Sequence, residues 1–231
     1  MVQPAWEQTA LASPNVLVCI ATVGDVSYEW ACAFADLWAV RVPGTMRRKL
    51  GPYTIDLARE HGALDAVSNG FKWLFFLDSD VIVPQDTIHR LLQHNQPIVS
   101  GFYARRHPPI HPLLLRRGND GNFGLVTNFS QGELVEVDLC PSGCLLISTE
   151  VFKRVPRPWF FYTDGRVIDI GGQSIQLPNG TSEDYFFSLR SKSYGFKVLV
   201  DTSLKVRHKG YFNILPRDDG GYEMDSEVPN P

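Results

Sequence analysis

The amino-acid sequence predicts an α/β fold in which helices cover both faces of a mostly parallel sheet. Apolar, β-branched segments alternate with helical segments over residues 16–100. The segments at 16–21 and 73–77 contain no charged residue, which is typical of strands buried on both faces. With 231 residues, 44% of them hydrophobic, the chain is long enough to bury the core of such a fold.

Strands and helices alternate in the first half of the chain. Residues 16–21 are expected to form a strand, and Ser27 is well placed to cap a helix that ends near residue 39. A second helix is predicted from residue 54 to about residue 68, because apolar side chains recur there at helical spacing and Asn-Gly follows. The next elements are a strand at 73–78, a helix within 85–95 and a strand beginning at 97–100.

The second half contains shorter strands and more loops. Residues 123–126 and 133–137 flank a polar segment and are predicted to pair as a β-hairpin. Thr181 or Ser182 is expected to cap a helix that Gly195 ends. The other predicted elements are strands at 142–148, 196–200 and 204–208, a short helix at 149–153, a Pro-rich aromatic loop at 156–162 and a mobile tail at 216–231.

Composition excludes several classes of protein. Lys and Arg number 22 against 25 Asp and Glu, and the net charge of −3 gives no reason to expect nucleic-acid binding. The first fifteen residues lack the features of a signal peptide, and no segment reaches the roughly 20 apolar residues of a membrane span. Cys19 and Cys32 are isolated, and Cys140 and Cys144 have CxxxC spacing without a second pair of ligands, so no zinc site is expected. Reduced cysteines in the core of a cytoplasmic protein are expected instead.

Two carboxylates follow the apolar strand at 73–77. Asp78 and Asp80 lie two positions apart, so in an extended chain their side chains point to one side and can reach the same cation. Neither acid would be stable unpaired in an apolar core. We therefore expect the pair where the strand emerges into a cleft, at the carboxyl edge of the sheet.

Three motifs together resemble those of GT-A glycosyltransferases, closest to the family 2 type and its dolichyl-phosphate mannose synthase and mannosylglycerate synthase relatives. The motifs are DSD at 78–80, GTSEDYFFSLR at 180–190 and VRHKG at 206–210. The resemblance covers about residues 16–211. It implies a GT-A (Rossmann-like) fold with a mostly parallel sheet and a smaller antiparallel sheet on the acceptor side.

The resemblance also implies an activity and a division of the chain. It predicts transfer of a hexose from a nucleotide-sugar donor to a hydroxyl acceptor, with GDP-mannose the first donor to test and a UDP-sugar the second. A single domain would cover residues 1–215, with donor binding in about 14–100 and acceptor binding in 101–215. No QxxRW segment follows the Glu-Asp pair, so polymer synthesis is not expected.

Metal binding is assigned to three residues by the resemblance. Asp78 and Asp80 would hold a divalent cation that bridges the donor diphosphate, and His208 would be the third ligand. Mn²⁺ or Mg²⁺ suits carboxylate and phosphate oxygens, and a neutral imidazole is an acceptable partner for Mn²⁺. The alternative for His208 is a surface histidine in the basic segment RHKG.

The acidic pair Glu183-Asp184 resembles the catalytic pair of inverting family 2 enzymes. Asp184 would then be the general base that removes the acceptor hydroxyl proton, with Glu183 in a secondary role and inversion slightly preferred. Acids in a first helical turn also stabilise the helix dipole, so a purely structural role stays open for both.

Donor contacts are assigned to residues in several segments. Thr22, Gly24 and Asp25 follow the first strand, where GT-A proteins contact the base and ribose, although a loop Asp also makes turns. The i,i+3 spacing of Asp56 and Arg59 also suits a helical ion pair. The complete predicted donor set is Thr22, Gly24, Asp25, Asp56, Arg59, Asp78, Ser79, Asp80 and Arg105, with Arg106 beside it.

Acceptor binding is assigned to Asp138, Gly143 and Trp159. Gly143 would permit close backbone approach or mark a β-bulge. The aromatic residues 159–162 would either form a platform that stacks on an acceptor sugar or fill a small core. A sugar, a polyol or a lipid-linked molecule is expected as acceptor. Without flanking membrane helices, at most peripheral membrane contact is expected.

Other functions fit parts of the pattern. FLDSDVIV also matches the first motif of haloacid-dehalogenase-type phosphatases, but Asp218-Asp219 lacks the strand that the later acidic pair of those enzymes follows. A nucleotidyltransferase would need a Gly-rich signature after the first strand, and TVGDVS is not one. A non-catalytic nucleotide-sugar-binding module would not need both Glu183-Asp184 and His208.

Overall fold

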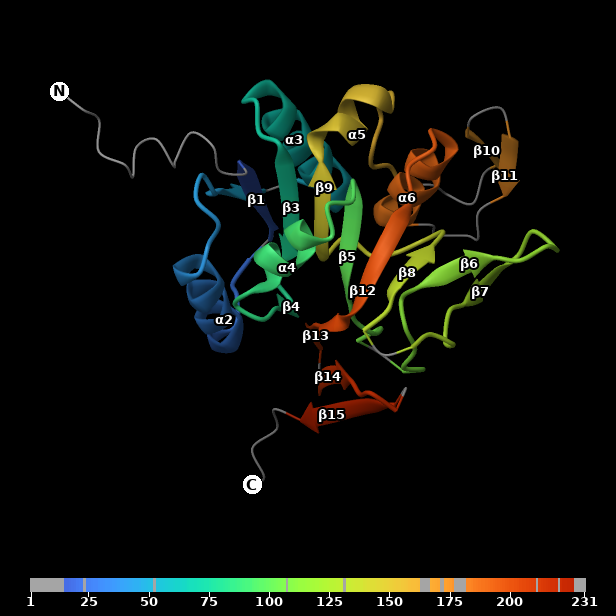
Figure 1. The fold of residues 1–231 in the computed structure, drawn as a ribbon. Coiled ribbons are helices and arrows are strands. Elements are labelled where there is room, and N and C mark those ends of the chain that lie inside the picture. Colours follow the sequence, from blue (N-terminus) through green and yellow to red (C-terminus); the bar gives the residue numbers. More distant parts are fainter. Residues whose placement is uncertain are drawn as a thin grey trace.

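The chain folds around one large mixed sheet with helices on both faces (Figure 1). The structure is a computed structural model that describes residues 15–22, 24–51, 53–106, 108–130, 132–162, 167–170, 173–176, 182–210, 212–219 and 221–226. The helices are α2 (Tyr28–Ala39), α3 (Ile55–Ser68), α4 (Thr87–Gln93), α5 (Thr149–Arg154) and α6 (Glu183–Ser193). The strands of the large sheet are β1 (Val16–Ala21), β2 (Met46–Leu50), β3 (Trp73–Asp78), β5 (Ile98–Phe102), β8 (Leu134–Val137), β9 (Cys144–Ser148) and β12 (Val198–Lys205).

Three smaller antiparallel sheets surround the large one (Figure 1). The first contains β4 (Val81–Ile82), β13 (Arg207–Lys209), β14 (Phe212–Pro216) and β15 (Tyr222–Ser226). The second pairs β6 (Leu115–Arg117) with β7 (Phe123–Leu125), and the third pairs β10 (Val167–Ile170) with β11 (Gln173–Gln176). Within the described helices, none is long and apolar enough to cross a membrane.

The large sheet has the strand order β2-β1-β3-β9-β5-β12-β8. Strands β2, β1 and β3 are parallel, as are β5 and β12, whereas β9 lies antiparallel between β3 and β5. Edge strand β8 is also antiparallel to its neighbour β12. The predicted α/β class is therefore confirmed, and the sheet is mixed rather than purely parallel.

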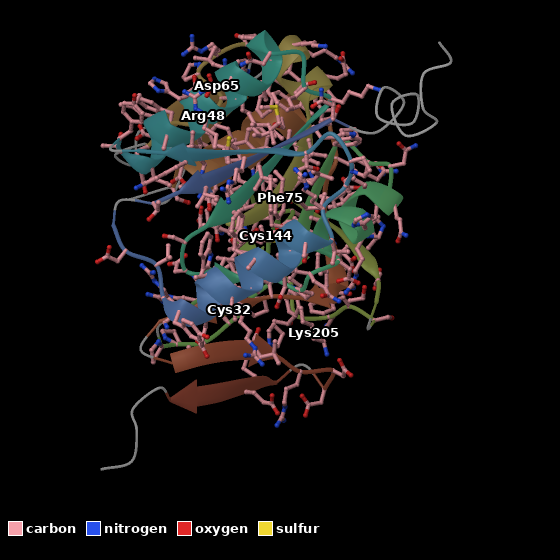
Figure 2. The ribbon with its side chains drawn as sticks, turned by 90° about the vertical axis from the view of Figure 1, so that its left-hand side faces the viewer. Cys32, Arg48, Asp65, Phe75, Cys144 and Lys205 are labelled. Carbon is pink, nitrogen blue, oxygen red and sulfur yellow. The ribbon has the colours of Figure 1, made fainter. Side chains whose placement is uncertain are left out.

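Successive side chains of β3 point to opposite faces of the large sheet and so contribute to both hydrophobic cores. Leu74 and Phe76 pack on the face covered by α3, α5 and α6, while Phe75 and Leu77 pack on the face covered by α2 and α4. Figure 2 shows α2 in front of the second face, over the sheet residues Phe75 and Cys144. Each face is closed by helices, which explains the uninterrupted apolar sequence before Asp78.

Local signals set the ends of the helices. The Ser27 hydroxyl accepts a hydrogen bond from Trp30 N at 3.2 Å and caps α2 as expected. Gly70 and Gly195 follow α3 and α6 with φ of 72° and 84°, a conformation that disfavours side chains other than glycine. Ser182 is the N-cap residue of α6, and the alternative cap Thr181 lies outside the described residues.

Several sequence predictions of secondary structure are wrong. Strand β2, with the sequence MRRKL, was not expected, because four of its five residues are exposed at the sheet edge and carry no apolar pattern. The segments at 123–126 and 133–137 do not pair with each other, since β7 pairs with β6 and β8 pairs with β12. All four cysteines are free, but Cys32 is exposed on α2 rather than in a core.

The C-terminal segment is more structured than expected. Strand β15 pairs with β14 along five residue pairs, from Phe212 with Ser226 to Pro216 with Tyr222, within the segment predicted to be a mobile tail. Strand β14 in turn pairs with β13, and β13 pairs with β4 directly after Asp80. The hairpin formed by β14 and β15 therefore extends the small sheet next to β13, the strand that contains His208.

Candidate active site

Asp78 ends β3 at the carboxyl edge of the large sheet. Its backbone is held on both sides: Asp78 N donates to Gly143 O at 3.0 Å, and its carbonyl oxygen accepts from Trp30 Nε1 at 2.9 Å. Ser79 and Asp80 follow immediately and lead into β4. The predicted position of the DSD at a strand end is thus what the structure shows.

A buried arginine joins two of the predicted acids. Arg59, on α3, is 2% exposed and donates from Nη2 to Asp78 Oδ2 and from Nε to Glu183 Oε1, both at 2.9 Å. Glu183 is 4% exposed in the first turn of α6, 124 residues away in sequence. Arg59 makes these bonds instead of the helical ion pair with Asp56 that its spacing allowed.

This cluster carries more negative than positive charge. Burial raises the pKa of the Asp78 carboxyl, and the charges of Asp80 and Glu183 add to this effect, while Arg59 opposes it. Asp78 Oδ1 and Arg59 Nη1 are buried with no hydrogen-bond partner among the described residues. Unpaired buried polar atoms are costly, so a polar ligand that pairs them would bind favourably.

Asp80 faces two cationic or metal-ligating side chains. Arg106 pairs with Asp80 Oδ2, and His208 Nε2 lies 3.6 Å from the same oxygen. The opposite ring nitrogen, Nδ1, lies 2.8 Å from Ala104 O, and because a carbonyl only accepts, Nδ1 carries the proton. Burial raises the pKa of Asp80, but the hydrogen bond and charge of His208 and the charge of Arg106 outweigh it and lower the pKa.

The tautomer of His208 suits a metal ligand. With the proton on Nδ1, a ring in its neutral form would present the Nε2 lone pair to the Asp80 carboxylate, and two facing acceptors need a proton or a cation between them. Adjacent ligands of a small octahedral ion lie about 3 Å apart, close to the observed separation. Within the described residues no group of three or more His, Cys, Asp or Glu side chains is arranged to hold a metal, so the structure does not bring Asp78, Asp80 and His208 together as the predicted set of three ligands. Of these three, Asp80 and His208 face each other.

The first turn of α6 places Asp184 beside the buried cluster. Its Oδ1 accepts from Tyr185 N at 2.8 Å and also bonds to the Ser182 hydroxyl. Burial, followed by the charge of Glu183, raises the pKa of Asp184 from 3.8 to about 7, against the opposing effects of Ser182 and Arg59. A carboxyl with this pKa can accept a proton near neutral pH.

Tyr103 and Gly143 pack against Asp78. The Tyr103 hydroxyl accepts a hydrogen bond from Gly143 N at 2.8 Å, and its ring contacts His208 edge to face at 5.3 Å between centroids. A Cβ on Gly143 would lie 2.7 Å from that hydroxyl and 2.9 Å from Asp78 Oδ2. Gly143 is therefore required for packing around the first acid of the DSD.

A pocket opens beside the DSD between β1, β2 and α3. It has a volume of about 220 Å³ and contains the predicted donor residues Thr22, Asp78, Ser79 and Asp80. Its remaining lining residues are Ala21, Leu50, Tyr53, Ile55 and Ala58. Asp56, next to Ile55, has a buried Oδ1 with no hydrogen-bond partner among the described residues.

Some predicted site residues do not contribute as expected. Trp159 is 5% exposed and its indole nitrogen donates to Val155 O at 2.6 Å, so the prediction that it stacks on an acceptor sugar is wrong. Asp138 bonds to Lys192 Nζ and to Arg117 N, both at 2.6 Å, which occupies both of its carboxylate oxygens.

Three predicted donor residues, Arg105, Gly24 and Asp25, do not line the pocket beside the DSD. Arg105 is exposed and its backbone nitrogen donates to His111 O, whereas its neighbour Arg106 reaches the DSD. Gly24 and Asp25 are exposed and are not part of the pocket lining, although Gly24 O accepts from the Thr22 hydroxyl at 3.1 Å.

The sequence signal missed Tyr103 at this site, whereas Tyr162 belongs to the aromatic segment 159–162 that is predicted as an acceptor platform. Tyr103 follows β5 and is 2% exposed; nothing in GFYARR distinguishes it from an ordinary core residue. Tyr162 is 47% exposed, unlike Trp159 in the same segment, and lies beside Glu183. Burial and the charge and hydrogen bond of Glu183 raise the pKa of Tyr162 to about 12.

No protein-family model and no curated protein matches this sequence. Among solved structures, the chain is similar to the crystal structure of A197 from STIV, with a TM-score of 0.57 and 15% sequence identity. The match covers 94% of this chain and 97% of that chain. At such low identity the similarity supports the mixed α/β fold, and function has to be argued from the site.

Proposed function

We propose that this protein is a divalent-metal-dependent glycosyltransferase with a GT-A fold, which moves a hexose from a nucleoside diphosphate sugar to a hydroxyl acceptor. The observation that carries the proposal is the grouping, at one sheet edge, of Asp80 facing His208 Nε2 and of Asp184 with a pKa near neutrality. The first group suits donor phosphates and the second suits an acceptor hydroxyl.

Donor binding is assigned to the pocket beside the DSD. The nucleoside would lie against Tyr53 and Thr22, and the diphosphate would lie near Asp80 and Arg106. Asp80 and His208 would hold Mn²⁺ or Mg²⁺, which when bound acts as a Lewis acid that neutralises the departing nucleoside diphosphate. GDP-mannose is the first donor to test because of the motif resemblance, and UDP-sugars are the second.

Catalysis is assigned to Asp184. Its carboxylate would take the proton from the acceptor hydroxyl, on the face of the sugar opposite the leaving group, which gives inversion. Glu183 and Arg59 act on this group indirectly: the Glu183 charge raises the Asp184 pKa, and Arg59 limits the increase. A base with a pKa near the working pH is the most effective proton acceptor.

A phosphatase has weaker support. In that alternative Asp78 would be a nucleophile assisted by a later acidic pair, but Asp78 Oδ2 is bonded to the buried Arg59. Asp218 and Asp219 lie in the turn between β14 and β15, where they pair with Lys205 and Arg217. The Asp-Asp pair is therefore engaged in surface ion pairs.

An assay of nucleoside diphosphate release tests the proposal. The protein is incubated with GDP-mannose or a UDP-sugar, Mn²⁺ and a panel of hydroxyl acceptors. The Asp184→Asn variant is compared with Asp36→Asn, a control that makes the same change at an exposed site on α2. We expect Asp184→Asn to bind donor normally and to lose acceptor-dependent release, and Asp36→Asn to retain both. Hydrolysis of p-nitrophenyl phosphate that depends on Asp78, with no release from any donor, would contradict the proposal.

A further inference from the structure

Two exposed aromatic side chains lie next to the acids of α6. Phe161 and Tyr162 are 49% and 47% exposed, unlike Trp159 and Phe160 directly before them, which are at most 5% exposed. Large aromatic side chains usually gain free energy by burial, so two consecutive exposed rings at the edge of a site indicate a binding surface. We call Phe161 and Tyr162 the aromatic step.

The aromatic step is anchored to the core and to the catalytic acids. Phe160 is 1% exposed and stacks on Phe187 of α6 with ring centroids 4.6 Å apart, which fixes the chain just before the step. The Phe161 ring meets the Phe186 ring with centroids 5.9 Å apart, and Tyr162 lies close enough to Glu183 for the charge of that acid to raise the tyrosine pKa. The exposed rings are therefore held in place rather than left on a free loop end.

The polar groups around the step limit what can bind. Glu183 and Asp184 lie at its inner end, where Arg59 is already shared between Asp78 and Glu183. Arg190, which packs on the Phe186 ring at 5.7 Å, donates to Pro156 O and Arg157 O. A carboxylate or phosphate would meet uncompensated negative charge there. An uncharged ligand with hydroxyl groups and an apolar face would instead satisfy both the acids and the rings, because aromatic faces pack against the C–H face of a sugar ring.

We propose that the aromatic step is the acceptor subsite and that the acceptor is a neutral saccharide, which stacks on Phe161 and Tyr162 and presents a hydroxyl to Asp184. This inference rests on the proposed function and narrows the acceptor from three classes to one. A lipid phosphate and an anionic acceptor such as a sugar acid or glycerate are disfavoured by the same acids.

Saturation-transfer NMR on the full-length protein tests the inference, in the presence of Mg²⁺ and GDP or UDP. The neutral probes are methyl α-mannopyranoside, methyl β-glucopyranoside and maltose; the comparison probes are glucuronate, glycerate and geranyl phosphate. We expect the neutral saccharides to bind. Phe161→Ala and Tyr162→Ala should each weaken binding roughly three- to tenfold, Tyr162→Phe should retain most of it, and Tyr28→Ala, at an 85% exposed tyrosine on α2, should change nothing.

The outcomes separate this inference from the proposed function. Nucleotide binding is measured by calorimetry on the same samples. If nucleotides bind but the saccharides do not, or bind equally well to Phe161→Ala and Tyr162→Ala, the acceptor inference is overturned and the proposed function stands. Preferred binding of glucuronate, glycerate or geranyl phosphate overturns it as well. If saccharides bind through the step and no nucleotide binds, the saccharide site stands and the glycosyltransferase proposal fails.

Discussion

Arg59 is the residue on which the candidate site depends most directly. Its guanidinium is 2% exposed and is shared between Asp78 on β3 and Glu183 on α6, so one cation balances two buried or partly buried acids. The planar fork of an arginine suits such a bridge, which the single ammonium of a lysine would not reproduce. Removing it would leave carboxylates in a cluster without compensating charge.

We expect Arg59→Gln to lower the free energy of unfolding by about 3–5 kcal/mol at pH 7, because it breaks a buried charge pair from one side. Urea denaturation followed by circular dichroism measures the change. The control is Arg48→Gln, whose partner is Asp65 at 2.8 Å in an ion pair with side chains 53% and 24% exposed (Figure 2). That exposed pair should contribute no more than about 1 kcal/mol. Equal effects of the two substitutions would contradict the assigned role of Arg59.

The raised pKa of Asp184 predicts a pH dependence of stability. The folded-state pKa of about 7 lies above the ordinary value of 3.8, so between these values the folded protein holds a proton that the unfolded chain releases. The contribution of Asp184 to the free energy of unfolding is therefore present at low pH and is lost as pH rises through about 7. Asp184→Asn should flatten this fall when unfolding is measured from pH 4 to pH 8.5.

Donor turnover should change with pH in the opposite direction. On the proposed function the base must be ionised, so the rate should rise through about pH 7 even as stability declines. Glu183→Gln removes the nearby negative charge that helps to raise the pKa and should move the rise to lower pH. A rate profile that does not respond to Glu183→Gln would argue against Asp184 as the base.

Individual residues were predictable where a local motif marked them. Asp78, Asp80, Glu183, Asp184 and His208 each lie in a short polar motif next to an apolar segment, and the structure brings them to one sheet edge. Tyr103 has no such signal, and the bond from Arg59 to Glu183 spans 124 residues, which no local pattern encodes. Trp159 and Tyr162 lie in one aromatic segment, and only tertiary packing decides which ring is buried.

At the scale of elements, the loop before β9 is packed against the end of β3. Gly143 lies in this loop, where a Cβ would come within 2.9 Å of Asp78 Oδ2 and Val81 Cγ2. Both are side-chain atoms of the segment 78–81 that carries the DSD, so a shift of this segment away from Gly143 would displace the site. The loop and the strand end therefore form one rigid unit.

We expect Gly143→Ala to lower the free energy of unfolding by about 1–3 kcal/mol, because the added methyl group overpacks this unit. It should also weaken Mn²⁺ binding, because a shift of Asp78 and Val81 would displace Asp80, which lies between them in the chain. The matched control is Gly124→Ala in β7, where a Cβ would have no atom within 4 Å and the change should be close to neutral. Thermal unfolding and Mn²⁺ titration of both variants measure the difference. A neutral Gly143→Ala would show that the packing at this loop is looser than the structure indicates.

Elements with an apolar periodic pattern were predicted well, and edge elements were not. The strands at 16–21 and 73–78 and the helices α2 and α3 lie within a residue or two of their expected ends. Strand β2 has the sequence of a solvated loop and exists because β1 supplies a parallel partner for it. Strand β15 is polar and Gly-flanked, and it depends in the same way on β14.

At the scale of the whole molecule, topology brings together segments that are far apart in sequence. Strands β1 and β3 end at the pocket proposed to bind the donor, and α6 brings Glu183 and Asp184, the proposed catalytic acids, to the same region through Arg59. The small sheet β15-β14-β13-β4 extends from the DSD and holds His208 opposite Asp80 (Figure 1). The sequence predicted the parallel part of the large sheet, but not the antiparallel insertion of β9 between β3 and β5.

The central claim is that Asp80 and His208 form a cation-dependent donor site, and calorimetric titration of GDP- and UDP-sugars with and without Mn²⁺ tests it most directly. We expect at least one nucleotide sugar to bind much more tightly with Mn²⁺, and Asp80→Ala and His208→Ala to weaken that binding about 10- to 100-fold while Asp184→Asn leaves it unchanged. Equal binding without a divalent cation, binding unaffected by Asp80→Ala and His208→Ala, or no binding of any nucleotide sugar would contradict the claim.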